Sequence, residues 1–339
     1  MKSFSEKEHK YILPCYTFDM IQTIVGVIRG GISGEYDVSL QTGGAVLRNL
    51  PKRYKAIDIV IDKNGVWHRS GIAHAPEKAL LHIDVVFNAL HGYYGEDGKL
   101  QKFLDHLQIP YTGSGAVPSA MGMHKMMAKN VFTQQGMKTP YAMVLKRNGP
   151  WSREAVKVYR SVPHPSVVKP ISGGSSLGTR VVNDFHELLD ALNHAFHYSE
   201  SVIVEEYISG REATCGVLDH FRGEEHYALP PVEIIPPTGR FFDYEVKYNG
   251  STREICPSFF SEKEKAEIMR CAILAHKALG LRHYSRSDFI ISSRGVHILE
   301  VNTLPGLTEE SLLPKACTAV GCHFSDFLDH TIQLALSGR

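Results

Sequence analysis

The chain lacks a surplus of charge of either sign, since 37 Lys and Arg stand against 36 Asp and Glu in 339 residues. A protein that binds nucleic acid usually carries a clear excess of basic residues. Acidic disorder is excluded as well, because 43% of the residues are apolar, which is ordinary for a globular protein. We therefore expect no nucleic-acid partner.

Long apolar runs and metal-binding cysteine motifs are also missing. The longest apolar stretches, such as 57–61 and 84–90, are too short to span a bilayer, so we expect no membrane association. The six cysteines form no C-x-x-C pair, which indicates free thiols in a reducing compartment. Residues 1–20 have no apolar signal core, and we interpret them as an extension of a cytoplasmic protein.

The common nucleotide-binding fingerprints are absent, because neither G-x-x-x-x-G-K-[ST] nor a complete G-x-G-x-x-G occurs. A different loop, rich in Gly and Ser, follows the apolar segment 167–170. Its small residues would let backbone N–H groups approach phosphate oxygens, with Lys169 supplying a positive charge. A plain β-turn is the alternative. Gly174–Gly178 also reads G-x-S-x-G, the serine-hydrolase elbow, but that motif needs a helix after Ser176, whereas 177–182 favours a strand.

Alternation of strand and helix patterns dominates the first hundred residues. An apolar segment at 21–29 ends at two glycines, helical spacing follows over 37–50, and short apolar strands are expected at 56–61 and 84–89. This order predicts an α/β layer with parallel strands. Ligands of such sheets bind at the carboxyl ends of the strands, where Gly30–Glu35 and His91–Gly98 fall.

Helical patterns recur along the rest of the chain. We expect helices over 119–135, where Lys125 and Lys129 share one face, over 187–196 with Asp184 as the cap, over 263–279, and over about 312–336. Most of the 18 histidines lie in polar stretches and are expected to be exposed. His91 differs, because it follows a buried strand and precedes a glycine loop.

Two strands near the C-terminal end carry the most specific pattern. Strands over 284–291 and 296–302, joined by a turn at 292–295, would form a hairpin. Alternation places Arg286 with Asp288 and Glu300 with Asn302, while Phe289, Leu299 and Val301 can point into the core. The hairpin would bring together three oxygen ligands that suit Mg²⁺ shared with phosphates, namely Asp288, Glu300 and Asn302. An exposed hairpin with polar side chains is the alternative.

Two further segments allow more than one interpretation. A strand at 205–212 would connect one structural unit to the next. Its backbone N–H and C=O groups could hydrogen-bond the edge of an adenine, while Glu205 and Glu212 could bind an amino group and a ribose. Charges at a strand end are also commonly just solvated. The aromatic and charged segment 241–248 is either a loop over a site or a surface hairpin.

The motifs of this chain, in the order in which they occur, resemble those of the D-alanine–D-alanine ligase family of the ATP-grasp superfamily. The resemblance runs from about residue 23 to 327. The motifs are GGISGEYDVSL, HGYYGEDGKLQ, IPYTGSG, VVKPISGGSSLG, VEEYISGRE, FFDYEVKY, SRSDF and LEVNTLPGLTEESLLPK. The resemblance implies an α/β, three-domain ATP-grasp architecture, in which an N-terminal parallel α/β domain is followed by two α+β domains clasping ATP. We place these domains at 21–112, 113–208 and 209–339, after the extension at 1–20.

The resemblance also implies residue roles. The ATP-binding residues would be Lys125, Lys169, Gly174, Ser175, Ser176, Glu205, Tyr207, Ile208 and Glu212. Two Mg²⁺ ions, or Mn²⁺, would be held by Asp288, Glu300 and Asn302. The catalytic residues would be Glu35, Ser175, Tyr248, Arg286 and Gly306, of which Glu35 holds the first D-alanine and Arg286 forms an oxyanion hole with the Gly306 N–H. The remaining substrate contacts would be His91, Lys247, Ser311 and Leu312.

By this resemblance, the chain is an ATP-dependent ligase that makes D-Ala-D-Ala for peptidoglycan through a D-alanyl phosphate, and it acts as a homodimer. The alternatives are a ligase of the same mechanism with D-Ser, D-lactate or another amino acid as second substrate, and a non-catalytic ATP-binding relative. The pair Lys247–Tyr248 favours an amine acceptor. The chain departs from the family pattern at His124, where Asp is usual, at Lys102, where Gly is common, and at Ser285 and Ser287 beside Arg286.

Overall fold

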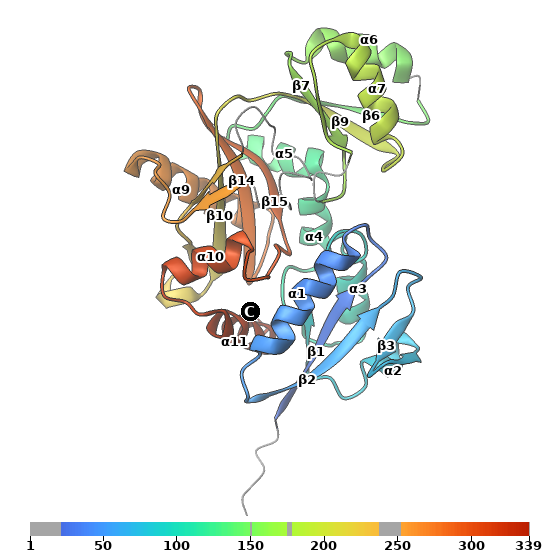
Figure 1. Cartoon of the computed structure of the whole chain (residues 1–339), viewed down its shortest axis with the longest axis vertical. Coiled ribbons are helices and arrows are strands. Elements are labelled where there is room, and N and C mark those ends of the chain that lie inside the picture. The colour runs from blue at the N-terminus through green and yellow to red at the C-terminus, as the bar shows by residue number, and fades with distance from the viewer. Residues whose placement is uncertain (1–21, 150, 175–177, 237–251, 339) are drawn as a thin grey trace, which may run out of the picture.

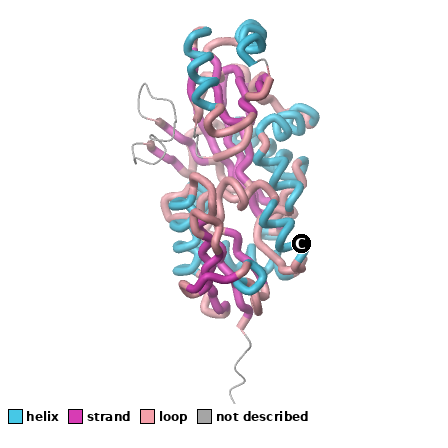
Figure 2. The backbone as a smooth tube through the Cα atoms, turned by 90° about the vertical axis from the view of Figure 1, so that its right-hand side faces the viewer, coloured by secondary structure: helices cyan, strands magenta, loops and turns pink. Residues whose placement is uncertain are grey.

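The computed structural model describes residues 22–149, 151–174, 178–236 and 252–338. Three sheets follow one another along an elongated molecule (Figures 1 and 2). The extension at 1–20 and four predicted site residues lie outside the described residues; these four are Ser175, Ser176, Lys247 and Tyr248.

The first sheet is five-stranded, in the order β4-β3-β2-β1-β5. Its elements are β1 (Thr23–Gly30), α1 (Tyr36–Asn49), β2 (Tyr54–Ile61), β3 (Trp67–Arg69), β4 (Ile72–His74), α2 (Pro76–Ala79), β5 (Val85–Asn88) and α3 (Lys99–His106). β1 pairs in parallel with β2 and β5, as expected from the sequence, whereas β3 and β4 are antiparallel. Sequence analysis missed β3 and β4, because three-residue strands are too short to show alternation.

The second sheet is four-stranded and antiparallel, in the order β6-β9-β7-β8. Its elements are β6 (Ala142–Lys146), α6 (Trp151–Ser161), β7 (Ser166–Pro170), β8 (Arg180–Val182), α7 (Phe185–Ala195) and β9 (Ser201–Glu206). Asp184 caps α7 as predicted, because its side chain accepts the Glu187 N–H at 2.9 Å. Gly178 leads into β8 and not into a helix. The serine-hydrolase alternative requires a helix at this position, so the structure contradicts it.

The third sheet is six-stranded and antiparallel, in the order β13-β12-β10-β14-β15 with β11 paired to β10. Its elements are β10 (Arg211–Asp219), the 3-10 turn η1 (Phe221–Gly223), β11 (His226–Ala228), β12 (Val232–Ile235), β13 (Arg253–Ile255), α9 (Glu262–Ala278), β14 (Tyr284–Ser292), β15 (Gly295–Asn302), α10 (Leu312–Ala319) and α11 (Phe324–Leu336). The α9 helix begins at a complete capping box formed by Ser261 and Glu264.

Two predicted helices are each divided in the structure. The helix expected over 119–135 breaks at His124, whose extended backbone ends α4 (Ala116–Met123) and begins α5 (Lys125–Gln134). The imidazole Nδ1 of His124 accepts the Met127 N–H at 3.2 Å, so this histidine is the N-cap of α5. The helix expected over 312–336 breaks between α10 and α11, where Gly321 adopts a positive φ of +71°.

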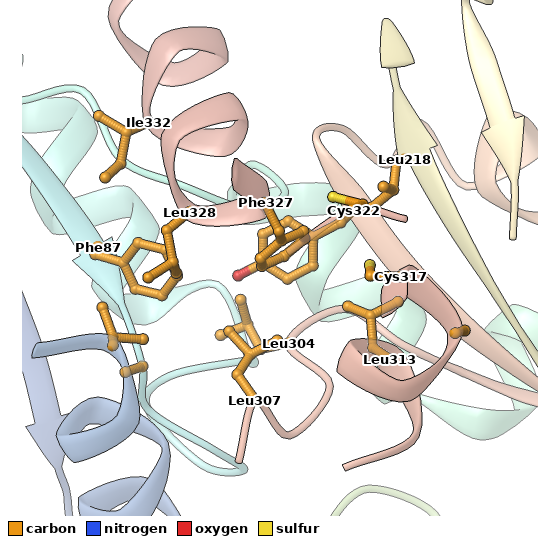
Figure 3. Packing of buried hydrophobic residues seen from close by; sticks show 14 of the residues in the cluster. Phe87, Leu218, Leu304, Leu307, Leu313, Cys317, Cys322, Phe327, Leu328 and Ile332 are labelled. Atoms are coloured by element: carbon orange, nitrogen blue, oxygen red, sulfur yellow. The ribbon is translucent and has the colours of Figure 1, made fainter. Parts of the chain in front are cut away.

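Helices of one sequence region pack against the sheets of another. Ala128 and Phe132 of α5 belong to the same buried cluster as residues of β10, α9 and β14. The α11 residues Phe327 and Ile332 share a cluster with Phe87 of β5 (Figure 3). The domain limits at 112 and 208 therefore stay a prediction, because packing crosses both positions.

The described cysteines, Cys215, Cys256, Cys271, Cys317 and Cys322, are free thiols, as the sequence predicted. Within the described ranges, no helix is both long and apolar enough to cross a bilayer.

Candidate active site

A cavity opens between the four-stranded and six-stranded sheets, and most of the predicted nucleotide and metal residues face it. These residues are Lys125, Lys169, Gly174, Glu205, Tyr207, Ile208, Glu212, Arg286, Asp288, Glu300 and Leu312. They come from both sheets, from the loop after β7, from the connection between β9 and β10, and from the first residues of α5 and α10. The fold thus brings together side chains that are far apart in the sequence.

Glu205 is buried in this cavity between two lysines. Its carboxylate lies 2.6 Å from the Lys169 ammonium and 2.8 Å from the Lys129 ammonium. Burial alone would raise the pKa of Glu205, but the two positive charges outweigh it and lower this pKa to about 2. Burial and the neighbouring Lys169 lower the pKa of Lys129, despite the attraction of Glu205. Burial would also lower the pKa of Lys169, but the negative charges of Glu205 and Glu300 outweigh burial and raise this pKa.

A third lysine lies at the mouth of the charged cluster. Lys125 donates a hydrogen bond to the Gly173 carbonyl at 2.8 Å, and its ammonium lies 3.6 Å from Glu300. Lys125 therefore connects the glycine loop to the hairpin. Lys125 and Lys169 give the cavity positive charge, which phosphate oxygens require.

The β14–β15 hairpin forms with the predicted partners. Asp288 pairs across the strands with Glu300, and Arg286 pairs with Asn302. The Arg286 guanidinium makes two 3.0 Å hydrogen bonds to the Asp288 carboxylate, which also accepts from Thr214 at 2.6 Å and from the Asn302 amide at 3.0 Å. The Asn302 nitrogen is thus used within the protein, which leaves its carbonyl oxygen as the atom suited to a cation.

Leu299 is a correction to the predicted hairpin. A β-bulge lies between Asp288 and Phe289, so that Asp288 pairs with Glu300 but Phe289 pairs with Ile298. Leu299 is the extra residue of the bulge, and it lines the cavity instead of pointing into the core. Phe289 and Val301 are buried, as predicted.

Glu35 precedes α1 and lies beside the glycine loop of the second sheet. A Cβ atom added to Gly174 would lie only 2.5 Å from the Glu35 carboxylate, and one added to Gly92 would lie 2.8 Å from it. Both positions need glycine because the carboxylate occupies the space that a side chain would fill. Glu35 therefore reaches from the first sheet to the loop that we predict to bind phosphate.

His91 is buried at the end of β5, and both of its ring nitrogens contact the protein. Nε2 lies 2.8 Å from the Thr42 hydroxyl, and Nδ1 lies 3.0 Å from the Leu304 carbonyl. The Leu304 contact requires a protonated Nδ1, which leaves Nε2 to accept from Thr42 when the ring is neutral. His91 thus joins α1 to the loop after β15.

Glu96 is a buried carboxylate that sequence analysis did not single out. It accepts the Gly92 N–H at 2.7 Å and the Leu304 N–H at 3.1 Å. Burial, with the nearby Glu35 charge, raises the pKa of Glu96 to about 7. Its position in the glycine loop after a buried strand was the available sequence signal. Lys129 was expected to share a helix face with Lys125, but no sequence pattern assigned it a role in the site.

The loop from 306 to 311 is closely packed. The Ser311 hydroxyl lies 2.8 Å from the Thr308 hydroxyl and accepts the Thr308 N–H at 3.1 Å. A Cβ atom on Gly306 would lie 3.0 Å from the Ser311 oxygen. Leu312 follows as the first residue of α10 and is buried at the cavity wall.

The connection from β9 to β10 forms the other end of the cavity. Ile208 is buried there, whereas Tyr207 is 36% exposed. Glu206 anchors the connection, because its carboxylate accepts the Tyr141 N–H at 3.1 Å and pairs with Arg294 at 3.0 Å. An apolar wall with exposed backbone polar groups is the usual setting for a nucleotide base.

The expectation that most histidines are exposed is wrong for several of them. His276, His283 and His297 are almost fully buried, because each has polar partners within the protein that the sequence does not reveal.

Comparison with known proteins agrees with this arrangement. The family description "D-ala D-ala ligase C-terminus" matches residues 131–333, and "D-ala D-ala ligase N-terminus" matches 24–79 and 68–114. The chain belongs to the D-alanine–D-alanine ligase family.

Other members of the D-alanine–D-alanine ligase family match almost end to end. The D-alanine–D-alanine ligase of Geobacter sulfurreducens is 39% identical, over 94% of this chain and 96% of its own length. Among solved structures, the VanG D-Ala:D-Ser ligase of Enterococcus faecalis has a TM-score of 0.81 at 31% identity, covering 93% of this chain and 99% of its own. The Bacillus anthracis D-alanine–D-alanine ligase complexed with ATP has a TM-score of 0.77 at 32% identity, covering 94% and 98%. The ATP-grasp fold predicted from the sequence is confirmed.

Proposed function

We propose that the chain is an ATP-dependent D-alanine–D-alanine ligase, which makes the D-Ala-D-Ala dipeptide for peptidoglycan precursors and releases ADP and phosphate. The observation that carries this proposal is the cavity in which Lys125, Lys169 and Glu205 face the Arg286–Asp288–Glu300 hairpin. Curated relatives with this activity match the chain almost end to end. Because a D-Ala:D-Ser ligase is among the structural matches, the identity of the second substrate is the point to test.

The first step is activation of a carboxylate, which is a poor electrophile. Transfer of the γ-phosphoryl group of ATP to the first D-alanine gives D-alanyl phosphate. Phosphoryl transfer depends on positioning and charge neutralisation, which Lys125 and Lys169 supply from two sides of the cavity. Glu35, at the edge of the glycine loop, holds the ammonium of the first D-alanine.

The second step is attack by the amine of the second D-alanine on the acyl phosphate. The tetrahedral oxyanion is stabilised by Arg286 and by the Gly306 N–H, a contribution of roughly 3–4 kcal/mol per donor. Arg286 is fixed for this role by its paired hydrogen bonds to Asp288. Ser311 and Leu312 contact the second substrate.

The hairpin residues fit Mg²⁺. Asp288, Glu300 and Asn302 offer only oxygen donors on adjoining positions of two strands, the donor type that hard divalent cations select. Two bound Mg²⁺, or Mn²⁺, would neutralise phosphate charge as it shifts during transfer. Thr214 and Arg286 orient the Asp288 carboxylate for this purpose.

Product mass spectrometry tests the proposal. We expect D-Ala-D-Ala, ADP and phosphate from D-Ala, ATP and Mg²⁺, and we expect D-Ala to outcompete D-Ser, D-lactate and L-amino acids as second substrate. Failure to release ADP with D-Ala would contradict the proposal. Sedimentation analysis of the same preparation tests the homodimer.

The metal assignment has its own test in Glu300→Gln. Loss of one metal carboxylate is expected to lower kcat by at least about 10²-fold, by analogy with the loss of a single electrostatic stabiliser. Exposed Glu262→Gln is the matched control and should retain wild-type turnover. Near-normal turnover of Glu300→Gln would show that the metal ligands are misassigned.

A further inference from the structure

Asp219, His226 and His276 form a compact cluster outside the cavity described above. One ligand atom from each residue lies within 4.8 Å of the other two. Asp219 ends β10, and His226 begins β11 directly opposite it in the antiparallel pair. His276 lies near the end of α9, which packs on these strands. Three separate elements therefore converge on one point.

The distances are short enough for one small ion to bridge them. Asp219 Oδ1 lies 2.7 Å from His226 Nδ1 and 3.0 Å from His276 Nε2. Tetrahedral Zn²⁺ binds nitrogen and oxygen at about 2.0–2.2 Å, which separates its ligand atoms by roughly 3.3 Å. Modest side-chain rotations would place the three ligand atoms around an ion.

His276 supplies the observation that favours an ion over a simple hydrogen-bond network. Its side chain is fully buried, and its Nε2 lies 3.0 Å from Asp219 Oδ1 but not in hydrogen-bonding alignment with it. Burying a polar nitrogen without a well-aligned partner is costly. A cation between Nε2, the Asp219 carboxylate and His226 would remove that cost.

The groups around the cluster are those of a metal site. His276 Nδ1 lies 2.7 Å from the Ser285 hydroxyl, so Nε2 is the ring atom that faces Asp219. The second oxygen of Asp219 accepts the His283 N–H at 2.5 Å, so Oδ1 remains for the cluster.

We propose that Asp219, His226 and His276 bind one Zn²⁺-class transition-metal ion, separate from the Mg²⁺ of the reaction. Two imidazoles and one carboxylate are borderline donors that favour Zn²⁺, Co²⁺ or Ni²⁺ over Mg²⁺. His226 is partly exposed and gives solvent access to the fourth position. The ion would tie the β10–β11 hairpin to α9. This inference does not depend on the proposed ligase activity.

Titration of the full-length, chelator-treated protein with Co²⁺ tests the site. A large excess of Mg²⁺ is kept present to occupy oxygen-only sites. We expect one Co²⁺ per chain with the intense visible bands of tetrahedral coordination, displacement by Zn²⁺, and no thiolate charge-transfer band, because the set contains no cysteine. Absence of stoichiometric tetrahedral Co²⁺, or a thiolate band, would overturn the proposal.

Three variants locate the ion. His226→Ala, at the exposed side of the cluster, is expected to weaken Co²⁺ binding by more than about 100-fold, and Ser285→Ala by about 10–100-fold as an outer-shell change. The matched control is His186→Ala, which removes an exposed histidine 3.7 Å from Asp190 and should leave binding unchanged. Retention of the Co²⁺ spectrum in a folded His226→Ala protein would contradict the assignment.

Discussion

Buried ionisable side chains at the cavity form ion pairs with one another and are largely shielded from solvent. Glu205, Lys129 and Lys169 are all buried, and each charge is balanced within 3 Å by an opposite one. Removing Glu205 would leave two buried lysine charges uncompensated, which is costly. The near-neutral composition of the chain thus conceals strong local separation of charge.

Glu205→Gln should therefore destabilise the protein by about 3–5 kcal/mol, the range typical of a broken buried ion pair. The measurement is the free energy of unfolding in urea. Lys146→Met, on the exposed end of β6, is the control and should change that free energy by less than about 0.5 kcal/mol. A similar small change in both variants would show that Lys129 and Glu205 are not coupled.

Glu96 predicts a pH dependence of stability. Its pKa in the folded protein is about 7, above the ordinary value of 4.5, so the folded state binds the proton more tightly than the unfolded state. The stabilisation is complete below pH 4.5 and is lost as the pH rises through 7. Between pH 5 and 8 the wild type should lose up to about 3 kcal/mol more unfolding free energy than Glu96→Gln.

Denaturant titrations of both proteins across this pH range provide the measurement, with exposed Glu77→Gln as the control that should follow the wild type. Parallel pH curves for the wild type and Glu96→Gln would contradict the raised pKa.

Residue-level prediction from sequence succeeded where one element carries the pattern. Alternation within two neighbouring strands was enough to predict that Asp288, Glu300 and Asn302 come together. It failed where a partner comes from a distant segment, as when Lys129 meets Glu205 or His276 meets Asp219. Spacing within a chain reports which side chains share a face, but not what that face packs against.

Among the elements, the break at His124 shows how one residue redirects a helix. Helical spacing runs through 119–135 without interruption, so sequence analysis predicted one helix. The imidazole of His124 then caps α5 and lets the chain turn between α4 and α5. The bulge at Leu299 is similar, because a single extra residue leaves no trace in a pattern of alternating side chains.

His124→Asp should stabilise the protein by about 0.5–1 kcal/mol. Aspartate is among the best N-cap residues, and its charge also favours the positive end of α5. Thermal unfolding followed by circular dichroism measures the change. As a reference in the opposite direction, Asp184→Ala removes the cap of α7 and should cost about 1 kcal/mol. A lower melting temperature for His124→Asp would show that the imidazole has another role there.

Over the whole molecule, the buried hydrophobic clusters differ in which parts of the chain they join. The cluster beneath the four-stranded sheet contains only residues between Met143 and Val204. In contrast, the cluster in Figure 3 joins β1, α1 and β5 to α10 and α11. The first and last described parts of the chain share a core, while the middle part has its own.

Calorimetry should therefore resolve two transitions without nucleotide, one of them belonging to 142–206. A non-hydrolysable ATP analogue with Mg²⁺, bound between the two sheets, should raise that transition and bring the two closer together. Hydrogen exchange of β7 and β9 identifies the unit that melts in each transition. A single two-state transition without nucleotide would contradict this division.

The shared core of Figure 3 has a consequence for synthesis on the ribosome. Phe87 is made 240 residues before its partner Phe327. At about 5–20 residues per second, the apolar face of the first sheet waits roughly ten to fifty seconds for α11 to appear. During that time the middle unit can already complete its own core. The nascent chain thus carries an unfinished hydrophobic surface on its oldest segment, which makes that segment the natural substrate for a holding chaperone.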